Sequence, residues 1–140
     1  LLKDSSLLCH SGNLTEAKKI YQDLLKIIPN HPEVLGNLGT IELQEGNTDI
    51  GVSFLTQALK TNPTEIKFII NLGNGLTELK KFDEALSYYD AAEKINPNFY
   101  LEYGTEYNIN YAYSINFLEG LEKTKKEIES IIDFIEVQEL

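Results

Sequence analysis

The sequence predicts an all-α fold, a right-handed superhelical stack of antiparallel helix hairpins. Proline recurs at one constant interval, at Pro29, Pro63 and Pro97. The triplet Asn37-Leu38-Gly39 returns at the same interval as Asn71-Leu72-Gly73. Small and aromatic residues keep the same phase at Gly12/Gly46/Lys80, Ala17/Gly51/Ala85, Tyr21/Leu55/Tyr89 and Ala58/Ala92. Six columns in one phase indicate a repeated unit.

Each period is expected to hold two helices, because its punctuating residues stop helices at two places. Proline lacks the backbone N–H and clashes with the preceding turn, so the three prolines should end helices. Midway between them, Gly12 and Gly46 can adopt positive φ after a helix, and Asn13 and Asn47 follow as candidate N-caps. In the single domain 1–140 this predicts hairpins at about 1–29, 32–63 and 65–97.

Glycines inside predicted helices indicate close helix crossings. Gly39 and Gly73 each lie in the first helix of a hairpin. A helical glycine costs about 1 kcal/mol relative to alanine, so it is expected where a backbone must approach closely. The expected neighbour is the second helix, at Gly51 or Ala85.

The last third departs from this phase. Asn110-Tyr111-Ala112 follows Asn71-Leu72-Gly73 by more than one period, which implies about five extra residues. An apolar stripe with helical spacing then follows, at Leu121, Ile128, Ile131, Ile132 and Ile135. This predicts an atypical fourth hairpin at 100–137, with a capping helix pair unrelated to the repeat as the alternative.

Composition excludes several classes of function. The net charge of −10 disfavours nucleic acid and anionic membrane surfaces, which select basic proteins. No apolar run is long enough to span a bilayer. A single cysteine, Cys9, allows no internal disulfide and suggests a reducing, cytoplasmic location. The acidity either serves solubility alone or favours a basic or neutral partner.

These columns resemble the tetratricopeptide repeat family, whose period is about 34 residues and whose unit is a helix-turn-helix. The resemblance covers about residues 1–98, with Leu35 and Ile69 in place of the usual early tryptophan. It implies a protein-binding scaffold whose first helices line a concave groove for a peptide or helix of a partner.

The resemblance also implies which residues would line that groove. They are the residues of the first helices that packing does not need, with one more in the atypical segment: Asn37, Thr40, Gln44, Lys67, Asn71, Asn74, Glu78 and Asn110. An asparagine row can pair with the backbone of an extended peptide, and this one resembles the asparagine ladder of O-linked N-acetylglucosamine transferases. Alternatively, the asparagines are structural and bond a neighbouring helix.

The sequence offers no catalytic, metal or cofactor site. Cys9 and His10 are adjacent and point about 100° apart on a helix, so they cannot act together. Glycine-rich phosphate loops, CxxC pairs and HExxH are absent. Tetratricopeptide domains that grip C-terminal carboxylates use several groove cations, whereas Lys67 here has Glu33 and Gly36 opposite, so such a ligand is not expected. We therefore expect no enzyme activity.

Three functional hypotheses remain. The first is a scaffold that binds a protein segment. The second is the non-catalytic recruiting arm of a larger enzyme, since Gly12-Asn13-Leu14, Asn30-His31-Pro32 and Leu38-Gly39 resemble the tetratricopeptide region of bacterial O-linked glycosyltransferase-like proteins. The third is a homo-oligomer formed by stacking of uncapped ends.

Overall fold

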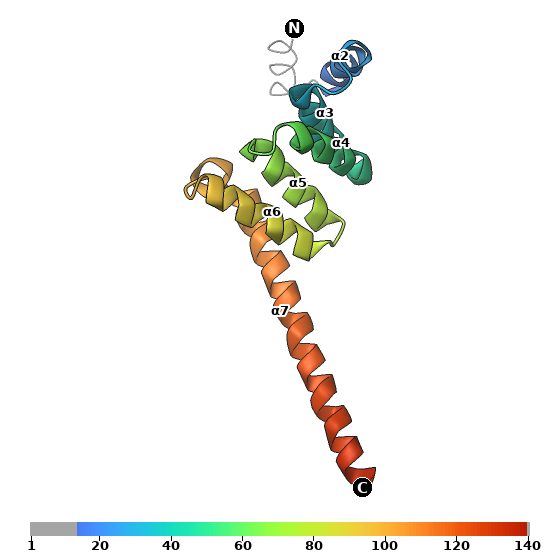
Figure 1. The fold of residues 1–140 in the computed structure, drawn as a ribbon, viewed down its shortest axis with the longest axis vertical. Coiled ribbons are helices and arrows are strands. Elements are labelled where there is room, and N and C mark those ends of the chain that lie inside the picture. Colours follow the sequence, from blue (N-terminus) through green and yellow to red (C-terminus); the bar gives the residue numbers. More distant parts are fainter. Residues whose placement is uncertain (1–13, 140) are drawn as a thin grey trace.

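The computed structural model describes the backbone of residues 14–139 and the side chains of residues 14–99 and 117–138. All of its regular structure there is helical, which confirms the predicted fold class. Successive helices stack side by side, and the last one projects away from the stack (Figure 1). The helices are α2 (Leu14–Ile27), α3 (Pro32–Gln44), α4 (Thr48–Thr61), α5 (Ile66–Glu78), α6 (Phe82–Ile95) and α7 (Tyr100–Glu139).

Two complete hairpins form the centre of the molecule. Helices α3 and α4 make the hairpin expected at 32–63, and α5 and α6 make the one expected at 65–97. Pro29, Pro63 and Pro97 each lie just beyond a helix end, as the missing proline N–H requires. The first helix of the hairpin expected at 1–29 lies outside the described residues, so α2 represents that hairpin alone.

The turns within the two hairpins share one geometry. Gly46 has φ of +85° and Lys80, one repeat later, has φ of +62°. The N–H of Asn47 donates to the Glu42 carbonyl at 2.8 Å, and the N–H of Lys81 donates to the Leu76 carbonyl at 2.8 Å. Both turns therefore use a left-handed residue to close the first helix, although only the first has a glycine there.

Of the two predicted N-caps, Asn13 is outside the described residues and Asn47 stands at the N-cap position of α4. Its side chain makes no cap hydrogen bond. Instead, the Asn47 amide donates to the Glu42 carboxylate at 2.8 Å. Asn47 thus ties the start of α4 to the end of α3.

The glycine crossing is confirmed in one hairpin and different in the next. A Cβ added to Gly39 would lie 2.9 Å from the Gly51 carbonyl oxygen, so α3 and α4 meet backbone to backbone. A Cβ added to Gly73 would lie 2.5 Å from the Tyr89 ring. The nearest neighbour of Gly73 is therefore on the second helix of the hairpin, as expected, but it is the Tyr89 ring and not Ala85.

The core runs along the stack between inner and outer helices. One cluster joins α2 to α3 through Tyr21, Leu38 and Ile41, and the other joins α3 to α6. The inner helices α3 and α5 bury residues on most of their circumference. Their remaining polar side chains are therefore confined to one strip of surface.

The predicted fourth hairpin at 100–137 is wrong, because residues 100–139 form the single helix α7. No proline follows Pro97, and a glycine such as Gly120 costs a helix only about 1 kcal/mol. Nothing in this segment therefore forces a turn. Helix α7 packs against α5 and α6, and the Phe117 ring of α7 lies with its centroid 4.4 Å from that of Phe82 of α6. None of the described helices has the length and apolar character that crossing a bilayer requires.

Candidate functional site

A hollow of about 190 Å³ lies between the inner helices α3 and α5. Five of its six lining residues are ones that the sequence analysis assigned to the groove. They come from both helices, so the fold brings together side chains such as Thr40 and Asn71 that are 31 residues apart in the chain. The lining residues are Thr40, Leu43, Gln44, Asn71, Asn74 and Glu78.

Asn71 is held across this hollow by a short relay of hydrogen bonds. Its amide donates to the Thr40 hydroxyl at 3.0 Å, and that hydroxyl donates to the Gly36 carbonyl at 2.9 Å. Because the Thr40 hydrogen is already directed to the backbone, its oxygen is fixed as an acceptor. The relay presents the carbonyl end of the Asn71 amide as the end able to accept from a ligand.

Asn74 is oriented from the outer helix α6. The Tyr89 hydroxyl donates to the Asn74 side-chain oxygen at 2.7 Å and also lies 3.3 Å from the Thr77 hydroxyl. Tyr89 is fully buried. A buried group on the far side of α5 thus sets the rotamer of a groove residue, and the groove is pre-organised at this point.

Asn37 behaves differently from its repeat equivalent, Asn71. Its side chain is buried, with 6% exposure for the residue, and its amide donates to the Tyr21 hydroxyl of α2 at 3.2 Å. The residue one repeat after Tyr21 is Leu55, which has no hydroxyl. Asn71 therefore lacks that partner and reaches Thr40 instead. At Asn37 the structural alternative for the asparagine row is the one observed.

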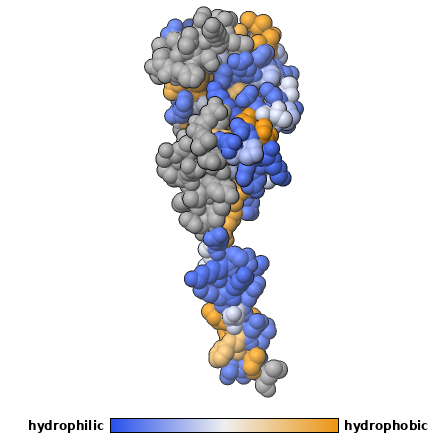
Figure 2. All heavy atoms as spheres, turned by 90° about the vertical axis from the view of Figure 1, so that its left-hand side faces the viewer, coloured by the Kyte–Doolittle hydropathy of each residue, from blue (hydrophilic) through white to orange (hydrophobic). Residues whose placement is uncertain are grey.

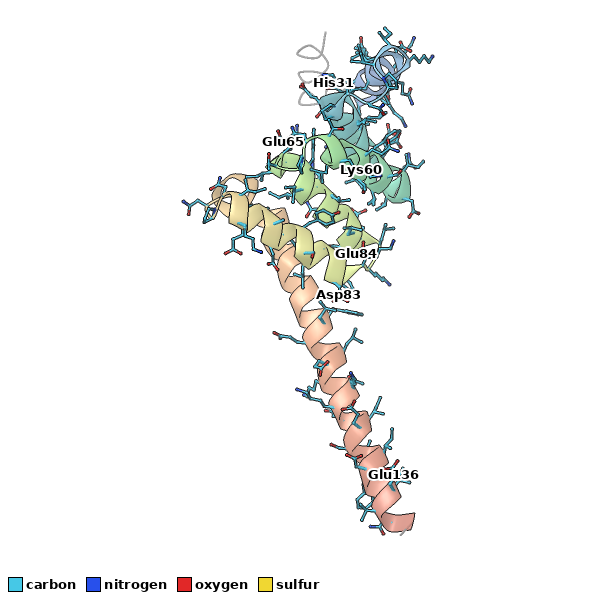
Figure 3. The ribbon with its side chains drawn as sticks, in the orientation of Figure 1. His31, Lys60, Glu65, Asp83, Glu84 and Glu136 are labelled. Carbon is cyan, nitrogen blue, oxygen red and sulfur yellow. The ribbon has the colours of Figure 1, made fainter. Side chains whose placement is uncertain are left out.

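A second hollow, of about 310 Å³, lies near the beginnings of α3 and α5 and contains the predicted residues Asn37 and Lys67. His31 and Glu65, the N-cap residues of these helices, lie there (Figure 3). The Phe68 ring fills its inner wall and packs on Gly36, where any side chain would collide with it. The lining residues are His31, Pro32, Glu33, Asn37, Asn62, Glu65, Lys67 and Phe68.

The sequence analysis missed several lining residues, namely His31, Pro32, Leu43, Asn62, Glu65 and Phe68. For Phe68 the sequence did hold a signal, which is Gly36, because a glycine in a helix interior marks a close neighbour. The side chain of the remaining predicted residue, Asn110, lies outside the described side chains. Seven of the eight predicted groove residues therefore line one or the other of these two hollows.

The charges of the two hollows are mostly acidic. Glu33, Glu65 and Glu78 carry negative charge, and Lys67 is the one lysine in the two linings. This balance favours a neutral or basic ligand over an anionic one. Among the described residues, no His, Cys, Asp and Glu side chains group as a metal site would require.

Stacked hairpins with a polar inner groove define the class of α-helical repeat solenoids. The tetratricopeptide repeat family matches residues 66–99, the segment of α5 and α6. The chain contains a tetratricopeptide repeat at these residues, and its stacked hairpins have the fold of tetratricopeptide-repeat domains.

Several known proteins are similar to this chain in structure or in sequence. The first tetratricopeptide domain of Spaghetti (RPAP3), bound to the HSP90 peptide SRMEEVD, has a TM-score of 0.72 at 18% identity, over 84% of this chain and 89% of that one. A mutant Thermobaculum terrenum O-GlcNAc transferase has a TM-score of 0.68 at 23% identity, over 71% of this chain and 19% of that one. The BBSome complex member bbs-4 of Caenorhabditis elegans is 29% identical over 103 residues, which are 69% of this chain and 22% of that protein.

Proposed function

We propose that the chain binds an extended segment of a partner protein in the groove between α3 and α5, and has no catalytic activity of its own. The observation that supports this most strongly is the first hollow. Thr40, Gln44, Asn71, Asn74 and Glu78 come from two different helices and line one depression.

The chemistry of these side chains suits a peptide backbone. Gln44 and Asn71 each carry both donors and acceptors, as a peptide group does. An extended peptide exposes its N–H and C=O groups along its length, so a row of amides can hold it without selecting particular side chains. Leu43 adds an apolar contact at the floor of the hollow.

The charge balance narrows the ligand further. Lys67 lies among Glu33 and Glu65 in the second hollow. A terminal carboxylate placed there would meet more negative than positive charge. We therefore propose a neutral or basic internal segment as ligand, unlike the acidic HSP90 peptide bound by the RPAP3 domain.

Paired affinity captures test the groove. The wild-type chain, Gln44→Ala, Asn71→Ala and the control Gln57→Ala would serve as baits, and mass spectrometry would identify the retained proteins. Gln57 is a glutamine of the outer helix α4, so it matches Gln44 in chemistry but not in position. We expect a protein kept by wild type and Gln57→Ala but lost by both groove variants. Retention by all four baits would reject this groove.

A second candidate is that the chain serves as the recruiting arm of a larger enzyme. This candidate is supported by the similarity to an O-GlcNAc transferase. The matched segment makes up 19% of that enzyme's chain. The chain likewise spans about a fifth of the curated relatives it matches. Reading the coding sequence on both sides would test this: a sugar-nucleotide domain on the same chain supports it, and a flanking sequence without a catalytic domain removes it.

A further inference from the structure

The second hollow, at the beginnings of α3 and α5, holds polar side chains that the fold itself does not pair. Four of its lining residues make no side-chain hydrogen bond or ion pair in the described part of the chain: Glu33, Asn62, Glu65 and Lys67. In the first hollow, by contrast, Asn71 and Thr40 are bonded to each other. The coloured surface of the repeats is largely hydrophilic, with small apolar areas between (Figure 2). The second hollow therefore suits a polar ligand that pairs with these side chains.

Asn37 adds a fixed acceptor to this hollow. The residue is 6% exposed, and its amide nitrogen donates to the Tyr21 hydroxyl of α2. An amide carries its donors at one end and its acceptor at the other, so the carbonyl oxygen of Asn37 is the end left for the hollow that the residue lines. No described group donates to that oxygen, and the buried Nδ1 of His31 is also unpaired in the described structure. Because unpaired atoms on buried side chains are rare and costly, they indicate a site that a bound hydrogen-bond donor completes.

The charge and the walls of the second hollow favour a cation on a long apolar stem. Glu33 and Glu65 provide two carboxylates and Lys67 one ammonium, so negative charge prevails. Pro32 and the Phe68 ring provide apolar surface, along which the methylene groups of a long side chain can pack. A volume of about 310 Å³ is at the small end of ligand pockets, about 300–1,000 Å³, and so suits a single side chain. We propose that the second hollow binds an arginine side chain of the partner segment, which deepens the proposed function and rests on it.

Arginine fits this hollow better than lysine because the acceptors are spread over several elements. Glu33 and Asn37 belong to α3, and Glu65 precedes α5. A guanidinium carries five N–H donors in one plane and can reach several of these acceptors at once. The ammonium of lysine is a compact and strongly hydrated point charge, so it gives up more hydration for fewer hydrogen bonds. The spread of acceptors therefore predicts a preference for arginine.

The two hollows are spaced for neighbouring side chains on one face of an extended segment. Asn37 and Lys67 line the second hollow, and Thr40 and Asn71 line the first. These positions are three and four residues apart on α3 and α5, which is about 5–6 Å at about 1.5 Å per helical residue. An extended chain advances about 3.3 Å per residue, and its alternate side chains share a face. A segment whose backbone bonds to Asn71 can therefore place an arginine two residues away in the second hollow.

Binding of short capped peptides tests this assignment. Four peptide sets carry arginine, lysine, glutamine or glutamate at one fixed central position, with mixed uncharged residues elsewhere, and fluorescence polarisation measures their affinity for the full chain. The arginine set should bind at least about tenfold more tightly than the glutamine set, because hydrogen bonds to charged groups are the strong ones. The lysine set should lie between them, and the glutamate set should bind most weakly.

Two double variants show whether the hollow causes that preference. Glu33→Gln combined with Glu65→Gln removes both carboxylates at similar size and should abolish the arginine preference. The control, Glu84→Gln combined with Glu93→Gln, makes the same change in net charge at exposed positions of the outer helix α6 and should keep it. Because Glu33 and Glu65 also lie at helix starts and can stabilise them, the readout is the ratio between peptide sets within one protein, which partial unfolding leaves unchanged.

The outcomes separate the arginine site from the groove itself. Equal binding of the arginine and lysine sets, or a preference that survives Glu33→Gln with Glu65→Gln, would overturn the arginine site and leave the groove in place. Asn71→Ala should weaken all sets by a similar factor and keep their ratio. A wild-type chain that binds none of the sets would reject the groove, and the arginine site with it, because a row of amides should hold a peptide backbone of any sequence.

Discussion

The side-chain amide of Asn37 donates a hydrogen bond to the Tyr21 hydroxyl at 3.2 Å, from one helix hairpin to the next. One repeat later Leu55 stands where Tyr21 would be, and Asn71 turns to Thr40 at the surface of the groove instead. A single hydroxyl thus separates a structural asparagine from a groove asparagine at equivalent positions.

The Tyr21→Phe variant should lose stability. It removes the acceptor of a buried amide N–H, and an unsatisfied buried donor costs about 1–3 kcal/mol. The free energy of unfolding from urea titration measures the loss. Tyr88→Phe is the control, since the half-buried Tyr88 makes no side-chain hydrogen bond in the described structure. Equal losses in the two variants would show that the Tyr21 hydroxyl is not special.

Substitution of Gly73 should be destabilising in proportion to side-chain size. A Cβ at Gly73 would lie 2.5 Å from the Tyr89 ring. Overpacking of this kind costs about 1–3 kcal/mol, so Gly73→Ala should lower the melting temperature and Gly73→Leu should lower it further. Gly120→Ala in α7 meets open space and should instead favour the helix by about 1 kcal/mol. Thermal melts followed by circular dichroism compare them, and an unchanged melt for Gly73→Leu would contradict the close packing.

The Lys80→Gly variant should be more stable than the wild type. Lys80 has φ of +62°, in the region that glycine occupies at no steric cost. Relief of the strain should add about 1 kcal/mol to the free energy of unfolding. The same change at Lys19, an exposed position in the interior of α2, should cost about 1 kcal/mol. The two variants should change the free energy of unfolding in opposite directions only if the left-handed turn at Lys80 exists in solution.

The ion pairs of Lys18 should make a pH-dependent contribution to stability. Its ammonium lies 2.8 Å from both the Glu42 and the Glu45 carboxylates, and hydrogen bonds to these two groups raise the pKa of Lys18 above 10.5. A raised pKa gives stability that is complete below the ordinary lysine pKa and is lost as pH rises through the pKa of the folded state.

Lys18→Met should therefore cost on the order of 1 kcal/mol at neutral pH. The cost should shrink as the pH rises beyond the ordinary lysine pKa. The exposed neighbour Lys19 provides the matched control, Lys19→Met. Urea titrations at neutral and alkaline pH measure both variants, and a Lys18 cost that stays constant with pH would refute the linkage.

Periodicity predicted the repeats well because each helix boundary has a local chemical cause. Pro29, Pro63 and Pro97 each follow the end of a helix, and Gly46 gave the turn between α3 and α4 directly. Helix α7 was mispredicted because a changed phase was interpreted as a break, although the segment contains no proline. The absence of a stopping residue would have indicated one helix.

Groove membership was predicted from position, while the role of each residue was not. Sequence spacing alone was enough to assign five residues to one groove, and they line one hollow in the structure: Thr40, Gln44, Asn71, Asn74 and Glu78. The burial of Asn37 depends on a contact between helices, which spacing does not show. The change from tyrosine at position 21 to leucine at the equivalent position 55 was visible in the sequence. Its consequence for Asn37 and Asn71 became clear only from the packing of α2 against α3.

The most direct test of the groove is a nuclear magnetic resonance titration. The side-chain amide signals of Gln44, Asn71 and Gln57 would be followed while a peptide from the captured partner is added. We predict shifts at Gln44 and Asn71 and in the backbone of α3 and α5, with Gln57 unmoved. Shifts confined to α4, α6 or α7, with Gln44 and Asn71 unchanged, would contradict binding in the groove.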